Sequence, residues 1–111
     1  MRILITGGFG FIGGRIAAYL SQAGHQVLLG SRNERNPPVW LPQAEVVKSQ
    51  WGDECAIQNS CEGVDVIVHA AGMNAQDCAA DPIAAYDFNG VATKRLVEAA
   101  SRVGVKKFIY L

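Results

Sequence analysis

Half of the 111 residues are apolar, which is enough for one modest hydrophobic core and too little for a two-domain enzyme. Ten basic residues balance ten acidic ones, so the formal net charge of zero argues against nucleic acid or an anionic membrane as a partner. The apolar run near the start, residues 3–5, is far too short for a secretion signal or a membrane span, and we expect a cytosolic protein.

Alternating strand and helix patterns occupy the first half of the chain. Residues 3–5 form an apolar run typical of a buried strand, and this run leads into a glycine-rich turn. Apolar residues then recur at helical spacing from Phe11 to Ala23, where Gly24 favours a helix end. Residues 26–29 predict a second strand, and the polar, proline-bearing residues 33–42 predict a loop.

The same alternation continues in the second half. Residues 46–47 predict a short third strand, residues 54–60 a brief helix and residues 64–68 a fourth strand. An aspartate followed by a proline then favours a helix start, because Asp is a good N-cap and Pro fits the first helical position. This pattern predicts one helix over residues 81–103, followed by a fifth strand at residues 107–111.

The order of these elements predicts a Rossmann-type, doubly wound α/β fold. Right-handed crossovers between parallel strands place helices on both faces of a sheet. We therefore expect one domain with strand order 3-2-1-4-5. Its ligand crevice would lie at the carboxyl ends of the first and fourth strands, where the topology reverses.

The turn from Thr6 to Gly13 joins the first strand to the first helix and carries two overlapping glycine motifs. Residues 8–13 satisfy GxGxxG, and Gly7, Gly10 and Gly13 satisfy GxxGxxG. Glycine permits a tight turn and close approach of the backbone to a pyrophosphate, while the helix N-terminus offers N–H groups and partial positive charge. A Walker-type loop is excluded, because no Gly-Lys-Ser/Thr follows.

Cysteine and histidine usage gives no indication of a metal site. The three cysteines form no CxxC pair, and the sequence contains two histidines, His25 and His69. A zinc site needs about four ligands at closer, patterned spacings. We expect reduced, structural thiols and no bound metal.

The motifs together resemble a known family. Thr6–Gly13, the His-Ala-Ala-Gly of residues 69–72 and Asn89 are similar to the corresponding motifs of the extended short-chain dehydrogenase/reductases, the NAD-dependent epimerase/dehydratase group. This group includes nucleotide-sugar 4-epimerases and dehydratases. The resemblance extends over the whole chain and does not single out a subfamily.

The resemblance implies roles for individual residues. The pyrophosphate would lie against Gly7, Gly10, Phe11, Ile12 and Gly13. Asp53 would accept a hydrogen bond from the adenine amino group, Ala70, Ala71 and Gly72 would pass under the nicotinamide-side ribose, and Asn89 would support the active-site backbone. Three alternatives stay open: Asp53 as a helix cap, Asn89 as an exposed polar residue, and His69 as a core histidine without a catalytic part.

The residues after the second strand bear on the choice of cofactor. NAD enzymes usually carry Asp or Glu there to bind the adenosine ribose, whereas this chain has Ser31 followed by Arg32. Serine does not repel a 2′-phosphate, and an arginine can pair with one in a bidentate contact. NADP is therefore favoured over NAD, unless Arg32 points to solvent.

The resemblance also implies a catalytic Ser/Thr and a Tyr-x-x-x-Lys pair, neither of which we assign here. No Tyr-x-x-x-Lys occurs in the sequence, and the family serine would follow the fifth strand, where the chain ends at Leu111. We expect residues 1–111 to be the N-terminal, NAD(P)-binding part of a longer enzyme, without its C-terminal substrate-binding part and without turnover alone.

The expected activity of the parent is hydride transfer in the epimerisation or dehydration of a nucleotide sugar, a small-molecule substrate. Two alternatives remain at this point: an NADPH-dependent reductase of a ketosugar or small carbonyl compound, and a non-catalytic dinucleotide-binding module that regulates a partner.

The resemblance further implies a homodimer formed through the helix over residues 81–103. One side of this helix would cover the sheet through Phe88, Ala92, Leu96, Ala99, Ala100 and Val103. A second apolar strip, to which Ile83, Tyr86, Val97 and Ala100 would contribute, would face the partner subunit. The alternative is that this strip packs against the C-terminal part of the parent.

Overall fold

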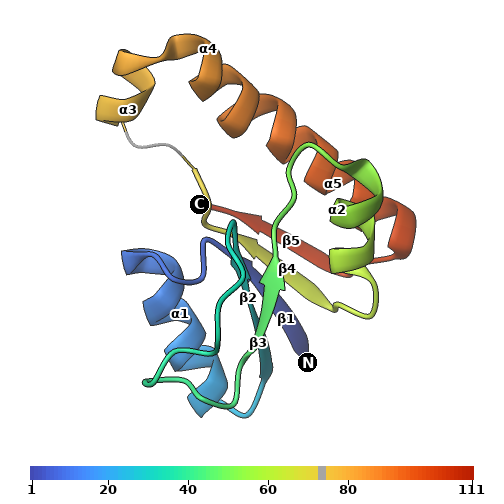
Figure 1. Cartoon of the computed structure of the whole chain (residues 1–111). Coiled ribbons are helices and arrows are strands. Elements are labelled where there is room, and N and C mark those ends of the chain that lie inside the picture. Colours follow the sequence, from blue (N-terminus) through green and yellow to red (C-terminus); the bar gives the residue numbers. More distant parts are fainter. Residues whose placement is uncertain (73–74) are drawn as a thin grey trace.

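A twisted parallel sheet forms the centre of the molecule (Figure 1). The computed structural model describes residues 1–72 and 75–111, and within them the strand order is β3-β2-β1-β4-β5, as the sequence predicts. Every neighbouring pair runs parallel. The strands are β1 (Arg2–Thr6), β2 (Gln26–Ser31), β3 (Glu45–Lys48), β4 (Val66–His69) and β5 (Lys107–Tyr110).

Helices cover both faces of the sheet (Figure 1). Helix α1 (Phe11–Gln22) lies on one face, while α2 (Glu54–Cys61) and α5 (Ala92–Val103) pack together on the other. Alternate residues of β1 enter the two cores: Ile3 and Ile5 point toward the α1 side, and Leu4 toward the side of α2 and α5. This alternation is the period-two pattern of a strand buried on both faces.

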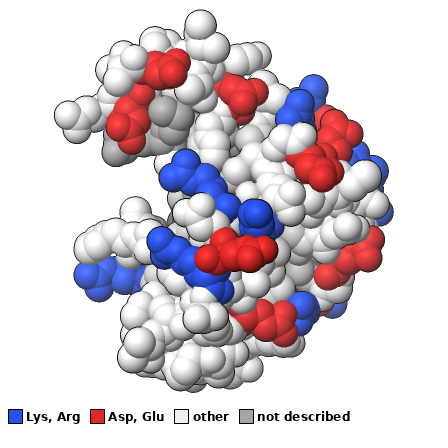
Figure 2. Space-filling view, in the orientation of Figure 1, with Lys and Arg blue, Asp and Glu red and all other residues white. Residues whose placement is uncertain are grey.

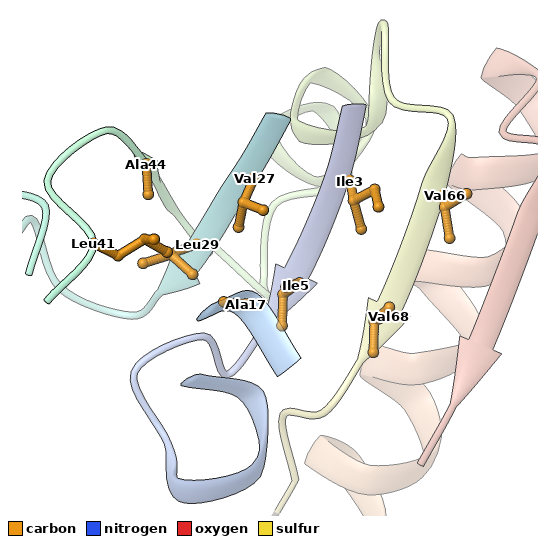
Figure 3. Packing of buried hydrophobic residues seen from close by; sticks show 9 residues of the cluster. All are labelled: Ile3, Ile5, Ala17, Val27, Leu29, Leu41, Ala44, Val66 and Val68. Atoms are coloured by element: carbon orange, nitrogen blue, oxygen red, sulfur yellow. The ribbon is translucent and has the colours of Figure 1, made fainter. Parts of the chain in front are cut away.

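The core on the α1 side also includes the connection between β2 and β3. Figure 3 shows Leu41 and Ala44 of this connection beside Leu29 of β2. Leu41 is 3% exposed, and the nearby Trp40 reaches the backbone of Gly14 in α1. The segment predicted as a loop therefore does form irregular structure, and it packs against the first helix.

The helix predicted over residues 81–103 is instead three consecutive segments. Helix α4 (Pro82–Ala85) begins at Asp81, whose carboxylate accepts a hydrogen bond from the Ala84 N–H at 3.0 Å. A π-helix, η1 (Tyr86–Val91), follows and passes into α5, which ends at Gly104 with φ +80°. The capping signals at both ends were correctly interpreted, whereas apolar periodicity does not reveal a π turn in between.

Three further details differ from expectation. Helix α3 (Ala75–Ala80) precedes α4 and was not predicted. Strand β4 begins at Val66 rather than residue 64, because the preceding Asp65 uses its carboxylate to accept the Arg2 backbone N–H at 2.8 Å. Ala100 is 4% exposed and packs on the sheet side, so its placement in the second apolar strip was wrong.

Within the described residues, no helix has the length and apolarity to cross a membrane.

Candidate functional site

A cleft of about 620 Å³ opens at the carboxyl ends of β1 and β4, the predicted crevice position; we call it the switch-point cleft. Figure 2 shows it as a notch between α1 below and α3 and α4 above, with acidic residues on the upper lobe, and with basic residues and an acidic group among them at the floor and below. The lining residues are Gly7, Phe9, Gly10, Gly30, Ser31, Arg32, Ser49, Trp51, Ala70, Ala71, Gly72, Asp77, Ala84, Asp87 and Phe88.

The glycine turn has three structural glycines, Gly7, Gly8 and Gly13, and one that is open to the cleft. Gly7 has φ +65°, and a Cβ there would lie 2.9 Å from the Ala71 nitrogen. A Cβ on Gly13 would collide with the Gly7 carbonyl oxygen. Gly10, by contrast, is exposed, and its nearest obstacle would be the same carbonyl oxygen at 3.2 Å. The turn thus brings bare backbone to the cleft at Gly10.

The N-terminus of α1 begins at this open glycine. Gly10 is the N-cap residue, and no side chain caps this helix end. The first N–H groups of any helix have no acceptor within the helix, and they carry the positive end of its dipole. Phe11 and Ile12, in the first turn, are 76% and 59% exposed and lie outside the cleft lining, while Gly13 is buried. Only the backbone of this turn is therefore suited to meet an anion.

The floor of the cleft is the backbone after β4. The Ala70 and Ala71 N–H groups both donate to the Thr6 hydroxyl oxygen at 3.1 Å. The adjacent His69 side chain is 2% exposed, and burial lowers its pKa from 6.5 to about 4. His69 is therefore a neutral core histidine, in agreement with the alternative that gave it no catalytic part.

The end of β2 forms the wall of the cleft that carries basic side chains. Ser31 and Arg32 both line the cleft. Ser31 is paired in register with Lys48 of β3, so the two side chains lie on the same face of the sheet. The Arg35 guanidinium lies 4.5 Å above the Phe9 ring, another residue of the cleft lining, in a cation–π contact.

Asp53 and Asn89 lie at the margins of the site. Asp53 caps α2, because its carboxylate accepts the Ala56 N–H at 3.1 Å, and it lies outside the residues that line the cleft. Asn89 is half-buried and donates to the Cys78 sulfur at 3.3 Å. Its Oδ1 would lie 3.3 Å from a Cβ on Gly72, so Asn89 stands directly against the cleft backbone.

Several lining residues were missed by sequence reasoning. Ser49 and Trp51 come from the connection after β3, where no motif singles them out. Asp87 and Phe88 come from η1, and Asp77 from α3. The Asp81 cap predicted that a helix begins there, but which of its side chains face the cleft depends on the π turn. None of the described residues form a group of three or more ligands suited to a metal ion.

Comparison with known proteins gives a consistent family. Residues 3–111 match the model of the NAD dependent epimerase/dehydratase family. A UDP-glucose 4-epimerase of Klebsiella pneumoniae is 31% identical over 124 residues, covering 99% of this chain and 87% of the relative. A 3β-hydroxysteroid dehydrogenase/Δ5→4-isomerase of Mycobacterium tuberculosis is also 31% identical, over 98% of this chain but 30% of the relative.

Solved structures share the fold over the whole chain. The UDP-glucose 4-epimerase of Thermotoga maritima with UDP-glucose aligns with a TM-score of 0.85 at 26% identity, covering 99% of this chain and 37% of that one. The UDP-glucose 4-epimerase of Bifidobacterium longum in complex with NAD+ and UDP aligns with a TM-score of 0.84 at 26% identity, covering 99% and 36%. The chain thus spans somewhat over a third of these two proteins.

Proposed function

Because this chain belongs to the NAD dependent epimerase/dehydratase family, we propose that its switch-point cleft binds a nicotinamide dinucleotide, with NADP favoured over NAD. The observation that carries this proposal is the exposed Gly10 backbone at an uncapped helix N-terminus, placed at the carboxyl ends of β1 and β4. Such a helix end is a ready-made site for a pyrophosphate. Relatives of known structure at 26% identity were solved with bound NAD.

The lining residues fit the successive parts of a dinucleotide. The pyrophosphate would lie on the backbone of Gly7, Gly10 and the first turn of α1, with Phe11 and Ile12 contributing N–H groups and Gly13 allowing the turn to close. The nicotinamide-side ribose would lie over residues 70–72, with Asn89 behind Gly72. When bound, the dinucleotide supplies hydride acceptance and return; these residues bind and orient it.

The adenosine end is the basis for favouring NADP. Arg32 lines the cleft next to Ser31, and Lys48 stands beside Ser31 on the neighbouring strand. Arg35 is held near the same wall by its contact with Phe9. Arg32 and Lys48, the two cations beside Ser31, suit a 2′-phosphate better than a free ribose, which is normally bound by a carboxylate. Asp53 would then serve two roles, as the α2 cap and as the acceptor for the adenine amino group.

For the whole protein we propose hydride transfer in the epimerisation or dehydration of a nucleotide sugar. The Thermotoga maritima relative was solved with UDP-glucose, and the Bifidobacterium longum relative with NAD+ and UDP. The upper wall of the cleft carries Phe88, Asp77 and Asp87, and we propose that the small-molecule substrate binds on this side. We assign no catalytic residue within residues 1–111, and we include neither nucleic acid nor a membrane among its partners.

A second candidate is an NADPH-dependent reductase or dehydrogenase of a small carbonyl or hydroxyl compound. The mycobacterial hydroxysteroid dehydrogenase is as similar to this chain as the Klebsiella epimerase, each at 31% identity. A 2-alkyl-3-oxoalkanoate reductase of Stenotrophomonas maltophilia is 26% identical over 99% of this chain. The basic wall at Arg32 is compatible with this candidate as well.

The cofactor assignment is tested by calorimetric titration with NADPH and NADH. We expect Arg32→Ala to weaken NADPH by about 1.5–3 kcal/mol, the effect of a lost charge-assisted hydrogen bond, and to leave NADH nearly unchanged. Arg102→Ala, on α5 where its side chain meets Gln58 of α2, is the matched control and should change neither affinity. Equal weakening of both cofactors by Arg32→Ala would refute the NADP preference.

A further inference from the structure

His69 is a buried polar side chain that lies next to the switch-point cleft without lining it. It ends β4, and both of its ring nitrogens have hydrogen-bond partners. Nδ1 lies 2.6 Å from the Thr6 hydroxyl oxygen, and Nε2 lies 2.8 Å from the Thr93 hydroxyl oxygen. The imidazole therefore links the end of β1 to the start of α5.

The partners of Thr6 fix which nitrogen of His69 carries the proton. A hydroxyl group has two acceptor lone pairs and one hydrogen to donate. The Ala70 and Ala71 N–H groups, each at 3.1 Å, donate to the two lone pairs of the Thr6 hydroxyl, and the Ala70 N–H also lies 3.3 Å from the Thr6 carbonyl oxygen. The hydroxyl hydrogen is then left for Nδ1, which must accept, so in a neutral ring the proton lies on Nε2 and is donated to Thr93.

The surroundings keep this ring uncharged. Three aromatic side chains pack around His69: Trp51 and Tyr110 at ring-centroid distances of 5.7 and 5.6 Å, and Phe108 at 6.0 Å. Among these neighbours Tyr110 is the titratable group. An imidazolium would carry N–H on both nitrogens, and Thr6 would then face three donors with two lone pairs. Burial and hydrogen bonding thus both disfavour the doubly protonated, charged imidazolium form of His69.

We infer that neutral His69, with its proton on Nε2, is a positioning residue that orients the Thr6 hydroxyl and thereby fixes the two amide groups under the bound dinucleotide. The inference rests on the proposed function, since it assigns a role in dinucleotide binding. It goes beyond that function by placing a hydrogen-bonded chain, Thr93–His69–Thr6, behind the cleft floor.

The hydrogen-bonded chain connects the two walls of the cleft through its floor. Thr6 directly precedes Gly7, whose backbone packs against Ala71. Thr93 lies in the first turn of α5, just after η1, which supplies Asp87 and Phe88 to the opposite wall. A change in the His69 hydrogen bonds would therefore affect the glycine turn and the cleft floor. The Thr93 end of the chain lies beside the opposite wall.

The proton position is measured by two-bond ¹H–¹⁵N correlation of the imidazole nitrogens in the ¹⁵N-labelled chain near neutral pH. His25→Gln identifies the His69 signals, because the sequence has two histidines. We expect an unprotonated shift at Nδ1 and a protonated shift at Nε2. The reverse pattern, or a doubly protonated ring, would overturn the inference.

The positioning role is tested with Thr93→Val, which removes the acceptor for Nε2 at a residue outside the cleft lining. We expect Nε2 to keep its proton, because Thr6 still needs an acceptor at Nδ1, whereas the ring loses the partner that holds it. The Ala70 and Ala71 amide protons should then exchange faster, and dinucleotide affinity should fall about three- to tenfold, the range for one lost neutral hydrogen bond. Thr93→Ser, which keeps the hydroxyl, should restore both readouts.

Wild-type dinucleotide affinity or wild-type amide exchange in a folded Thr93→Val variant would overturn the positioning role. A wild-type chain that binds neither NAD nor NADP would refute the proposed function, and with it this role, while the imidazole spectrum would still decide the proton position. The two failures are therefore distinguishable.

Discussion

Single glycines of the Thr6–Gly13 turn meet different neighbours, so substitutions there should separate folding from binding. At Gly13 a methyl group would collide with the Gly7 carbonyl oxygen, which belongs to the rigid turn. Overpacking of this kind costs about 1–3 kcal/mol. We expect Gly13→Ala to lower the free energy of unfolding by that amount in urea denaturation.

Gly52→Ala is the matched control for this prediction. No atom lies within 4 Å of a Cβ at Gly52, and its φ is outside the left-handed region. The control should stay within about 0.5 kcal/mol of the wild type, as is usual for a surface substitution. Equal stability of the Gly13 and Gly52 variants would show that the Gly7 carbonyl can move away from a side chain at Gly13 at little cost.

His69 should make stability depend on pH in the acid range. Its pKa in the folded chain is lowered from 6.5 to about 4 by burial, so between these values the unfolded chain binds more protons. The stabilisation is complete above pH 6.5 and is lost as pH falls toward 4, by about 3 kcal/mol in total. Urea denaturation at a series of pH values measures this slope.

The variant His69→Gln isolates this contribution, because glutamine does not titrate. It should lower stability at neutral pH yet flatten the slope between pH 6.5 and 4. His25→Gln, at a partly exposed histidine, should leave the slope in place. An unchanged slope in His69→Gln would exclude His69 as its source.

Among the elements, those with repeating patterns or capping residues were predictable, and the π-helix was not. The strand order follows from alternation and crossover handedness, and the Asp81 cap locates the start of α4. A π turn changes the hydrogen-bond register without changing residue types in a recognisable way. The cleft-facing positions of Asp87 and Phe88 therefore could not be predicted, whereas Gly7, Ser31 and Arg32 could, because motif and strand end fix them.

Helix α2 offers a test of the two roles proposed for Asp53. Asp53→Ala should lower the free energy of unfolding by about 1 kcal/mol, since the carboxylate caps the Ala56 N–H. Asp53→Ser should recover most of that loss, because serine is an equally good N-cap. Chemical denaturation of both variants measures the capping term.

The binding role predicts the opposite behaviour for serine. Its shorter side chain should not reach an adenine amino group, so Asp53→Ser should remain several-fold weaker for the dinucleotide in calorimetry despite its recovered stability. Wild-type affinity in Asp53→Ser would leave Asp53 as a helix cap alone.

At the scale of the whole molecule, the proposed homodimer depends on the outer side of α4, η1 and α5. Ile83 and Tyr86 are 83% and 74% exposed and Val97 is 43% exposed, whereas the opposite side is buried on the sheet. We expect Tyr86→Glu with Val97→Glu to convert a dimer to a monomer in light scattering. Tyr19→Glu, at a 73% exposed tyrosine on α1, is the control and should leave the dimer intact.

A wild-type monomer, or a dimer unaffected by the paired glutamates, would remove this side from the interface. The same exposed strip would then be available to pack against the C-terminal part of a longer parent.

The central claim is that the exposed backbone at Gly10 receives the dinucleotide pyrophosphate. Gly10 is exposed with φ −77°, and a Cβ there would lie 3.2 Å from the Gly7 carbonyl oxygen, so a side chain needs only a small shift of the turn and would stand at the cleft lining. Calorimetric titration of Gly10→Val with NADPH and NADH, beside wild type and Gly52→Val, tests this directly. We predict that Gly10→Val keeps the fold and loses binding of both cofactors, while Gly52→Val binds like the wild type. Unchanged affinity in a folded Gly10→Val chain would contradict the account.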